Sequence, residues 1–173
     1  MYLRSRSCKT GGEKSMSVFI SIPRVVAERI KREAEREGVS VKEYVVELLT
    51  QNLNPVDRAK EYIKVSLELL AQAKEELAKG NIRQSSEKTW GAVALAIKAY
   101  AYWRDKRRLE SYHDLWKYKN KVASELGEWV GRVFKEASAL HVCFYEGWCT
   151  KEDVEKVILE VEKLVNRIAE SLN

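Results

Sequence analysis

The strongest constraint on the fold lies in residues 17–54, a segment too small to bury a core by itself. Its first seven residues, SVFISIP, alternate between the two faces of an extended chain and predict one short β-strand that ends at Pro23. Two amphipathic helices are expected over 24–37 and 40–52, separated by a glycine. One strand and two short helices bury too little apolar surface to be stable. We therefore expect a homodimer or higher homo-oligomer, whose contacts include Val18, Phe19, Ile20, Ile22, Leu48 and Leu49.

The order strand, proline, helix, Gly-x-Ser, helix resembles the ribbon-helix-helix family. In that family two chains pair their strands into an antiparallel ribbon, whose outward residues enter the DNA major groove. The resemblance places Ser17, Phe19 and Ser21 on that outward face. Base reading relies on side chains with paired donors and acceptors, which two hydroxyls and a phenyl ring do not supply. We interpret the segment as a dimerisation element, with a DNA-binding regulator as an alternative, preceded by a disordered basic tail over 1–16.

The remainder, residues 56–173, is expected to form a five-helix up-and-down bundle. Apolar residues recur there at helical spacing, with breaks that predict helices over 56–79, 82–104, 113–126, 128–145 and 150–173. The second of these helices is apolar nearly all round, so we expect it to lie at the centre. With only eight Gly and two Pro in 173 residues, long helices are favoured over a β-sandwich. The predicted fold class is mainly all-α.

Three runs in this bundle resemble the archaeal PaREP family. They are QSSEKTWGAVALAIKAY at 84–100, SYHDLW at 111–116 and LHVCFYEGW at 140–148, and together the resemblance spans most of 56–170. That family is similar in turn to the HEPN superfamily of helical bundles, named for higher-eukaryote and prokaryote nucleotide-binding domains. The resemblance implies a HEPN-like bundle.

Catalytic HEPN proteins are metal-independent ribonucleases that use an Arg, then four to six intervening residues, then a His. The histidine would move protons and the arginine would hold the scissile phosphate. Arg108 and Arg107 precede His113 with four and five intervening residues, and they form the first candidate pair. The second pair, His141 with Lys135, has a lysine in place of the arginine. The competing interpretation is structural: His113 begins a helix, and His141 bonds to a backbone or carboxylate group.

Positive charge is concentrated in residues 82–121, which hold ten basic and four acidic residues, whereas the whole chain carries +5. Such a patch can contact phosphate backbones, although a solvated basic face is a common alternative. The candidate nucleic-acid contacts are Arg104, Lys106, Arg107, Arg108, Lys117 and Lys119.

Several functions are disfavoured by the absence of their motifs. No cofactor-binding loop occurs, no bound metal is expected from His141, Cys143 and Cys149, and three cysteines predict reduced thiols. We expect a cytoplasmic protein that does not enter a membrane. The first hypothesis is a non-enzymatic dimeric binding or assembly protein that contacts nucleic acid or a partner protein. The alternatives are a ribonuclease or nucleotide-binding bundle, and a ribbon-helix-helix DNA-binding regulator.

Overall fold

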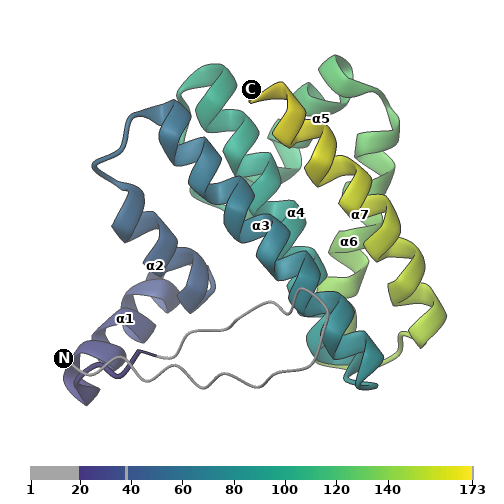
Figure 1. Ribbon diagram of the computed structural model, residues 1–173, viewed down its shortest axis with the longest axis horizontal. Helices are drawn as coiled ribbons and strands as arrows, with labels where there is room; N and C mark the ends of the chain where they lie inside the picture. The colour runs from purple at the N-terminus through teal and green to yellow at the C-terminus, as the bar shows by residue number, and fades with distance from the viewer. Residues whose placement is uncertain (1–19, 38, 173) are drawn as a thin grey trace, which may run out of the picture.

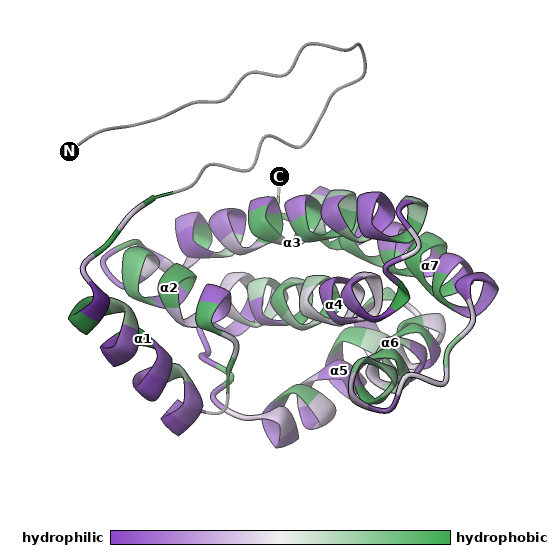
Figure 2. Ribbon diagram, turned by 90° about the horizontal axis from the view of Figure 1, so that it is seen from below, coloured by the Kyte–Doolittle hydropathy of each residue, from purple (hydrophilic) through white to green (hydrophobic). Residues whose placement is uncertain are grey.

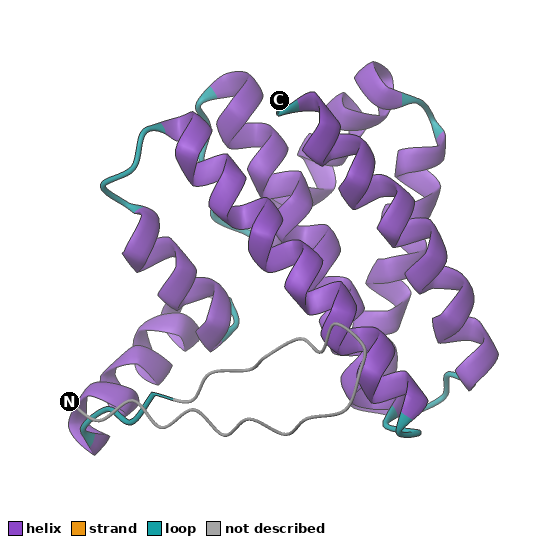
Figure 3. Cartoon of the chain, in the orientation of Figure 1, coloured by secondary structure: helices purple, strands orange, loops and turns teal. Residues whose placement is uncertain are grey.

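The computed structural model describes residues 20–37 and 39–172, and these are almost entirely helical (Figures 1 and 3). The described residues form seven helices: α1 (Arg24–Glu37), α2 (Val41–Thr50), α3 (Pro55–Ala78), α4 (Ile82–Asp105), α5 (Tyr112–Leu126), α6 (Trp129–Glu146) and α7 (Lys151–Ser171). The all-α class is confirmed. Each helix begins and ends within about two residues of its expected bounds, which is the usual uncertainty of a helix end.

The predicted strand is not seen in the part of it that the structure describes. Residues 20–23 have no regular secondary structure, while residues 17–19 and the predicted tail over 1–16 lie outside the described residues. A β-strand needs a neighbouring strand for its backbone hydrogen bonds. The described part of this single chain provides none. The ribbon itself therefore stays a prediction about two chains.

Helix α4 is the centre of the bundle, as its all-round apolar sequence predicted. Every residue from Ala92 to Tyr102 is buried, and α4 contacts all four other bundle helices. In Figure 2, α3 and α7 lie on one side of α4, and α5 and α6 lie on the other. Two hydrogen bonds join α3 and α4 closely. The Ser66 hydroxyl of α3 donates to the Ala92 carbonyl of α4 at 2.7 Å, and the Ser85 hydroxyl of α4 donates to the Ala73 carbonyl of α3 at 2.8 Å.

The bundle departs from strict up-and-down order at α5, which runs parallel to α4. The start of α5 lies beside the middle of α4, where the Tyr112 and Trp90 rings are 5.6 Å apart, and Glu125 near its end accepts a 2.6 Å hydrogen bond from Tyr100. The connecting residues 106–111 run back along α4. Six extended residues span about 20 Å, nearly the length of the fifteen-residue helix segment they retrace. Lys106 starts this reversal with φ +56°.

A second correction concerns the cysteines, which the sequence predicted to be reduced. Cys143 at the end of α6 and Cys149 before α7 form a disulfide, with their Cα atoms 5.8 Å apart. Gly147 ends α6 in the left-handed conformation, φ +74°, and turns the chain so that Cys149 lies beside Cys143. Both cysteines are buried. The prediction of reduced thiols was therefore wrong for two of the three cysteines.

We expect this disulfide to stabilise the α6–α7 turn. It closes a loop between cysteines six positions apart, for which the loss of unfolded-chain entropy corresponds to about 2 kcal/mol. For a chain of this size, reduction should lower Tm by about 4–8 °C. The reductant should not change the Tm of the Cys149→Ser variant. If thiol titration under denaturing conditions gives the same count before and after reduction, the disulfide does not exist in solution.

Candidate functional site

Helices α1 and α2 form an arm at one side of the bundle (Figure 2). This arm carries an unusual share of exposed apolar residues. Of fourteen large hydrophobic side chains that are exposed in the described residues, eight lie in 20–53. Leu49 is 78% exposed, and Ile20 and Val25 are each 70% exposed. The other five are Ile22, Val26, Val41, Leu48 and Leu53. Exposed apolar side chains gathered in one segment indicate an interaction surface. We call these eight residues the apolar arm surface.

The opposite face of α2 is tied to the bundle by charged and polar groups. Lys98 of α4 is only 4% exposed, and its ammonium forms an ion pair with Glu43. One turn further along α2, Glu47 accepts hydrogen bonds from the hydroxyls of Tyr62 and Tyr102. A charge buried this deeply requires an opposite charge close by. A buried cation of α4 is therefore one of the groups that attach the arm to the bundle.

Burial and the carboxylate of Glu47 also determine the protonation state of Tyr62 and Tyr102. Burial and then the hydrogen bond to Glu47 raise the pKa of Tyr62 far above its ordinary value. Burial, followed by the nearby Glu47 charge, raises the pKa of Tyr102 as well. Both hydroxyls therefore stay protonated and act as hydrogen-bond donors to the carboxylate.

The first catalytic candidates, Arg107 and Arg108 with His113, lie near the contact between the arm and the bundle. Both arginines are paired with carboxylates there. Arg108 donates to Glu37 at 2.9 Å and pairs with Glu47 at 2.7 Å, so it joins α1 and α2 to the segment after α4. Arg107 pairs with Asp114 at 3.6 Å. His113 is exposed on the first turn of α5, and no described residue is hydrogen-bonded to its side chain. The structure thus gives both arginines structural partners rather than a bond to His113.

The second candidate pair is divided between two faces of α6. Lys135 lines a groove between α5 and α6, whereas His141 faces α4 and pairs with Glu87 at 2.8 Å. Six residues along a helix correspond to about 240° of rotation, so the two side chains cannot meet. The partner of His141 is a carboxylate, in line with the structural interpretation of this residue.

His141 and Glu87 line a small cavity where the arm meets the bundle. Its volume is ≈ 120 Å³, and its wall also includes Ser40, Lys98 and Tyr112. A histidine oriented by a carboxylate is suited to proton transfer. Small-molecule pockets, however, usually measure about 300–1,000 Å³. This cavity has room for a few water molecules and not for a substrate of ordinary size.

The remaining basic candidates do not form one open patch. Arg104 pairs with Glu125 at 3.1 Å, and the Lys106 ammonium donates to the Trp103 carbonyl at 3.3 Å. Lys117 is exposed, but Lys119 is buried against Trp116, with its Nζ 5.1 Å from the centre of that ring. The excess positive charge of residues 82–121 is therefore partly neutralised by acidic residues distant in the sequence.

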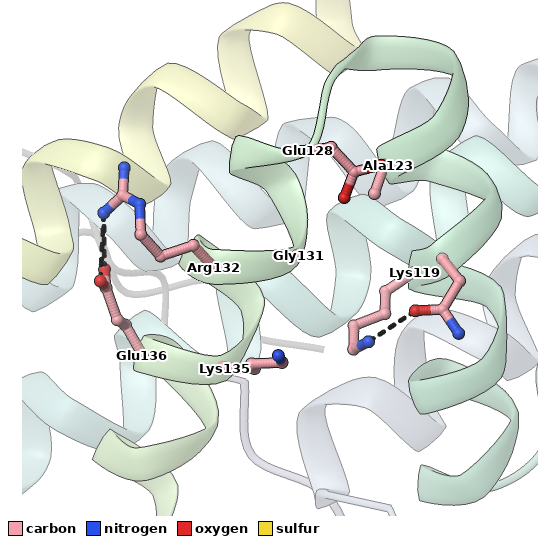
Figure 4. Close-up of a pocket in the computed structure, with 8 residues that line it drawn as sticks. Lys119, Ala123, Glu128, Gly131, Arg132, Lys135 and Glu136 are labelled. Atoms are coloured by element: carbon pink, nitrogen blue, oxygen red, sulfur yellow. Dashed lines mark hydrogen bonds and ion pairs between the residues drawn. The ribbon is translucent and has the colours of Figure 1, made fainter.

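The groove between α5 and α6 was not predicted from the sequence, in which Lys119 and Lys135 were candidates for different sites. The structure brings both into one groove of ≈ 530 Å³ (Figure 4). Each lysine stands eight residues from Gly127, where the two antiparallel helices join. Residues at equal distances from the turn of a helical hairpin lie opposite one another. This equal distance from Gly127 was the sequence signal that could have placed Lys119 and Lys135 together.

Two further features are absent from residues 20–37 and 39–172. No group of three or more His, Cys, Asp or Glu side chains is arranged to hold a metal ion. No helix in these ranges is both long enough and apolar enough to cross a bilayer.

The buried ion pair of Lys98 and Glu43 gives a stability prediction. Replacing Lys98 by Met leaves Glu43 without its buried counter-charge, so the free energy of unfolding should fall by about 3–5 kcal/mol. The control is Lys74→Met, which removes the partner of Glu162 from an exposed pair and should cost about 0–1 kcal/mol. Denaturant unfolding measures both, and equal losses would show that Lys98 does not carry the attachment.

The family match covers most of the bundle but not the arm. The Archaeal PaREP1/PaREP8 family matches residues 61–165. A crystal structure of a protein from Sulfolobus solfataricus is similar, with 27% sequence identity and a TM-score of 0.58, over 63% of this chain and 97% of that one. No curated protein shows significant similarity to the chain. Because the family match covers more than half of the sequence, the chain belongs to the Archaeal PaREP1/PaREP8 family.

Proposed function

We propose that this chain is a dimeric assembly protein, in which two copies pair through their N-terminal arms and so hold two helical bundles together. The observation that carries the proposal is the apolar arm surface: eight exposed hydrophobic residues within 20–53. Fully burying one such side chain contributes about 1.5–3 kcal/mol. A second copy of the same surface is the partner that the sequence pattern of 17–54 favours.

The two faces of α2 support this arrangement. Glu43, Glu47 and Thr50 follow one another at helical spacing on the face that meets the bundle. Val41 and Leu48 are seven residues apart on the opposite face, and both are exposed. The contacts with the bundle therefore leave the apolar face of α2 available for a second chain.

The order of residues 20–53 supports a ribbon-helix-helix mode of pairing. Ile20 and Ile22 alternate in a segment that ends at Pro23 and leads directly into α1. Such a segment gains backbone hydrogen bonds when it pairs with the same segment of another chain. The family match begins at residue 61, after α2, which fits an arm added to a PaREP-type bundle.

In this proposal the bundle has a HEPN-like architecture, and it contacts a nucleic acid or a partner protein without cleaving RNA. A ribonuclease of the HEPN type would need an arginine free to hold the scissile phosphate. Here Arg108 is paired with Glu37, Glu47 and Glu110, and Arg107 with Asp114. These pairs favour a structural role for the segment before His113.

The oligomeric state of a charged variant tests the proposal. Leu49→Asp places a carboxylate on the apolar arm surface, and because Leu49 is 78% exposed the fold of the single chain should persist. Burying an unpaired charge in an interface costs several kcal/mol. Light scattering coupled to size-exclusion chromatography should therefore give twice the mass of one chain for the native protein and one chain mass for the variant.

The matched control is Leu159→Asp, since Leu159 is also exposed but lies on α7 of the bundle. This variant should remain a dimer. Native protein that elutes as a single chain at all concentrations would overturn the proposal, and so would a Leu49→Asp variant that dimerises as well as Leu159→Asp does.

A further inference from the structure

The groove between α5 and α6 presents two lysines toward each other. Figure 4 shows Lys119 reaching in from α5 and Lys135 from α6, with their ammonium groups facing across the groove. The groove measures ≈ 530 Å³, which lies within the usual range for small-molecule sites. Two cations that face one another repel, so the arrangement is more stable when an anion lies between them.

Lys119 is the more unusual of the two, because its charge is buried. The residue is only 6% exposed, and its ammonium donates a 2.7 Å hydrogen bond to the side-chain oxygen of Asn120. Among the described residues, no carboxylate lies within ion-pairing distance of it. Burial, followed by the charge of Lys135, lowers the pKa of Lys119. Buried lysines are normally paired with an opposite charge, whereas Asn120 and the rings of Trp116 and Phe134, which lie around the Lys119 ammonium, are all uncharged.

The carboxylates that border the groove do not meet that need. Glu136 is paired with Arg132 at 3.1 Å, and Arg132 also holds Glu160 at 3.0 Å. In Figure 4, Glu128 lies beside Ala123 at the other end of the groove from the two lysines. Neither of these carboxylates forms an ion pair with Lys119 or Lys135.

Space is available at the groove as well as charge. Gly131 lines the groove, and a Cβ atom built on this residue would meet nothing within 4 Å. Gly131 lies one helical turn before Lys135, so a bound group can approach the backbone of α6 beside that lysine.

We propose that the α5–α6 groove binds a small phosphate-bearing molecule, whose phosphate group lies between the ammonium groups of Lys119 and Lys135. Because Lys119 donates one N–H to Asn120, the two lysines have up to five N–H donors left for a phosphate. Charge-assisted hydrogen bonds to phosphate are about twice as strong as neutral ones. Asn120 positions Lys119 through its side-chain oxygen. The phosphate can be free inorganic phosphate or that of a nucleotide. This site is separate from the apolar arm surface and does not depend on dimerisation.

Calorimetric titration of the full-length protein tests the site, with inorganic phosphate in one experiment and a nucleoside monophosphate in a second, at constant ionic strength. Binding of either ligand supports the site, and the ligand that binds more tightly identifies the source of the phosphate. Lys135→Ala should weaken binding at least about tenfold, since it removes one of two charged contacts. Lys135 is exposed, so this variant should keep its fold.

Two further variants complete the design. Lys119→Met keeps the volume of the buried side chain without its charge and should abolish binding. Lys64→Ala removes an exposed lysine of α3 and should bind as the native protein does. The proposal would be overturned if neither inorganic phosphate nor the nucleoside monophosphate bound at concentrations up to about 10 mM. It would also be overturned if Lys135→Ala and Lys64→Ala bound the ligand with equal affinity.

Discussion

Helix α4 passes through the bundle without an exposed residue between Ala92 and Tyr102, and the one cation in that stretch, Lys98, must find its counter-charge inside the protein. Glu43 of α2 supplies it. The cost of leaving a buried ammonium unpaired is large, so this requirement orients the arm on the bundle. With Glu43 and Glu47 turned toward the bundle, the apolar face of α2 is turned away from it. A buried charge in the bundle core thereby determines which face of the arm is presented to another molecule.

The second determinant is the path of residues 106–111. Because this segment runs back along α4, α5 starts beside Trp90 and lies parallel to α4. Arg108, which lies on this returning segment, reaches Glu37 and Glu47 and adds a second attachment for the arm. The same path places α5 against α6 as an antiparallel hairpin, which creates the groove shared by Lys119 and Lys135. One reversal of the chain therefore shapes both the junction and the groove.

Local sequence signals predicted the helices well. Apolar periodicity, the capping residues Ser40 and Thr150 and the positive-φ glycines Gly127 and Gly147 act within one or two turns, so they can be read directly from the sequence. The all-round apolar sequence of α4 likewise predicted its central position. These features depend little on which helix is the neighbour.

The candidate site was harder to predict, because its contacts join residues far apart in the chain. Arg108 has the spacing of a catalytic residue before His113, but its partner Glu37 is 71 positions away. His141 pairs with Glu87, 54 positions away. The direction of α5 depends on how far the connecting segment extends, and residue spacing does not report this. The cysteine count, similarly, gave no indication that Gly147 would bring Cys143 and Cys149 together.

The most direct test of arm-to-arm pairing is hydrogen exchange of the backbone amides of residues 20–22, followed as a function of protein concentration. In the described part of the single chain these amides have no backbone hydrogen-bond acceptor. Slow exchange there would consequently have to come from a second chain. Pairing in the ribbon-helix-helix mode predicts protection at high concentration that is lost on dilution. Rapid exchange of these amides at every concentration, while the core of α4 stays protected, would contradict it.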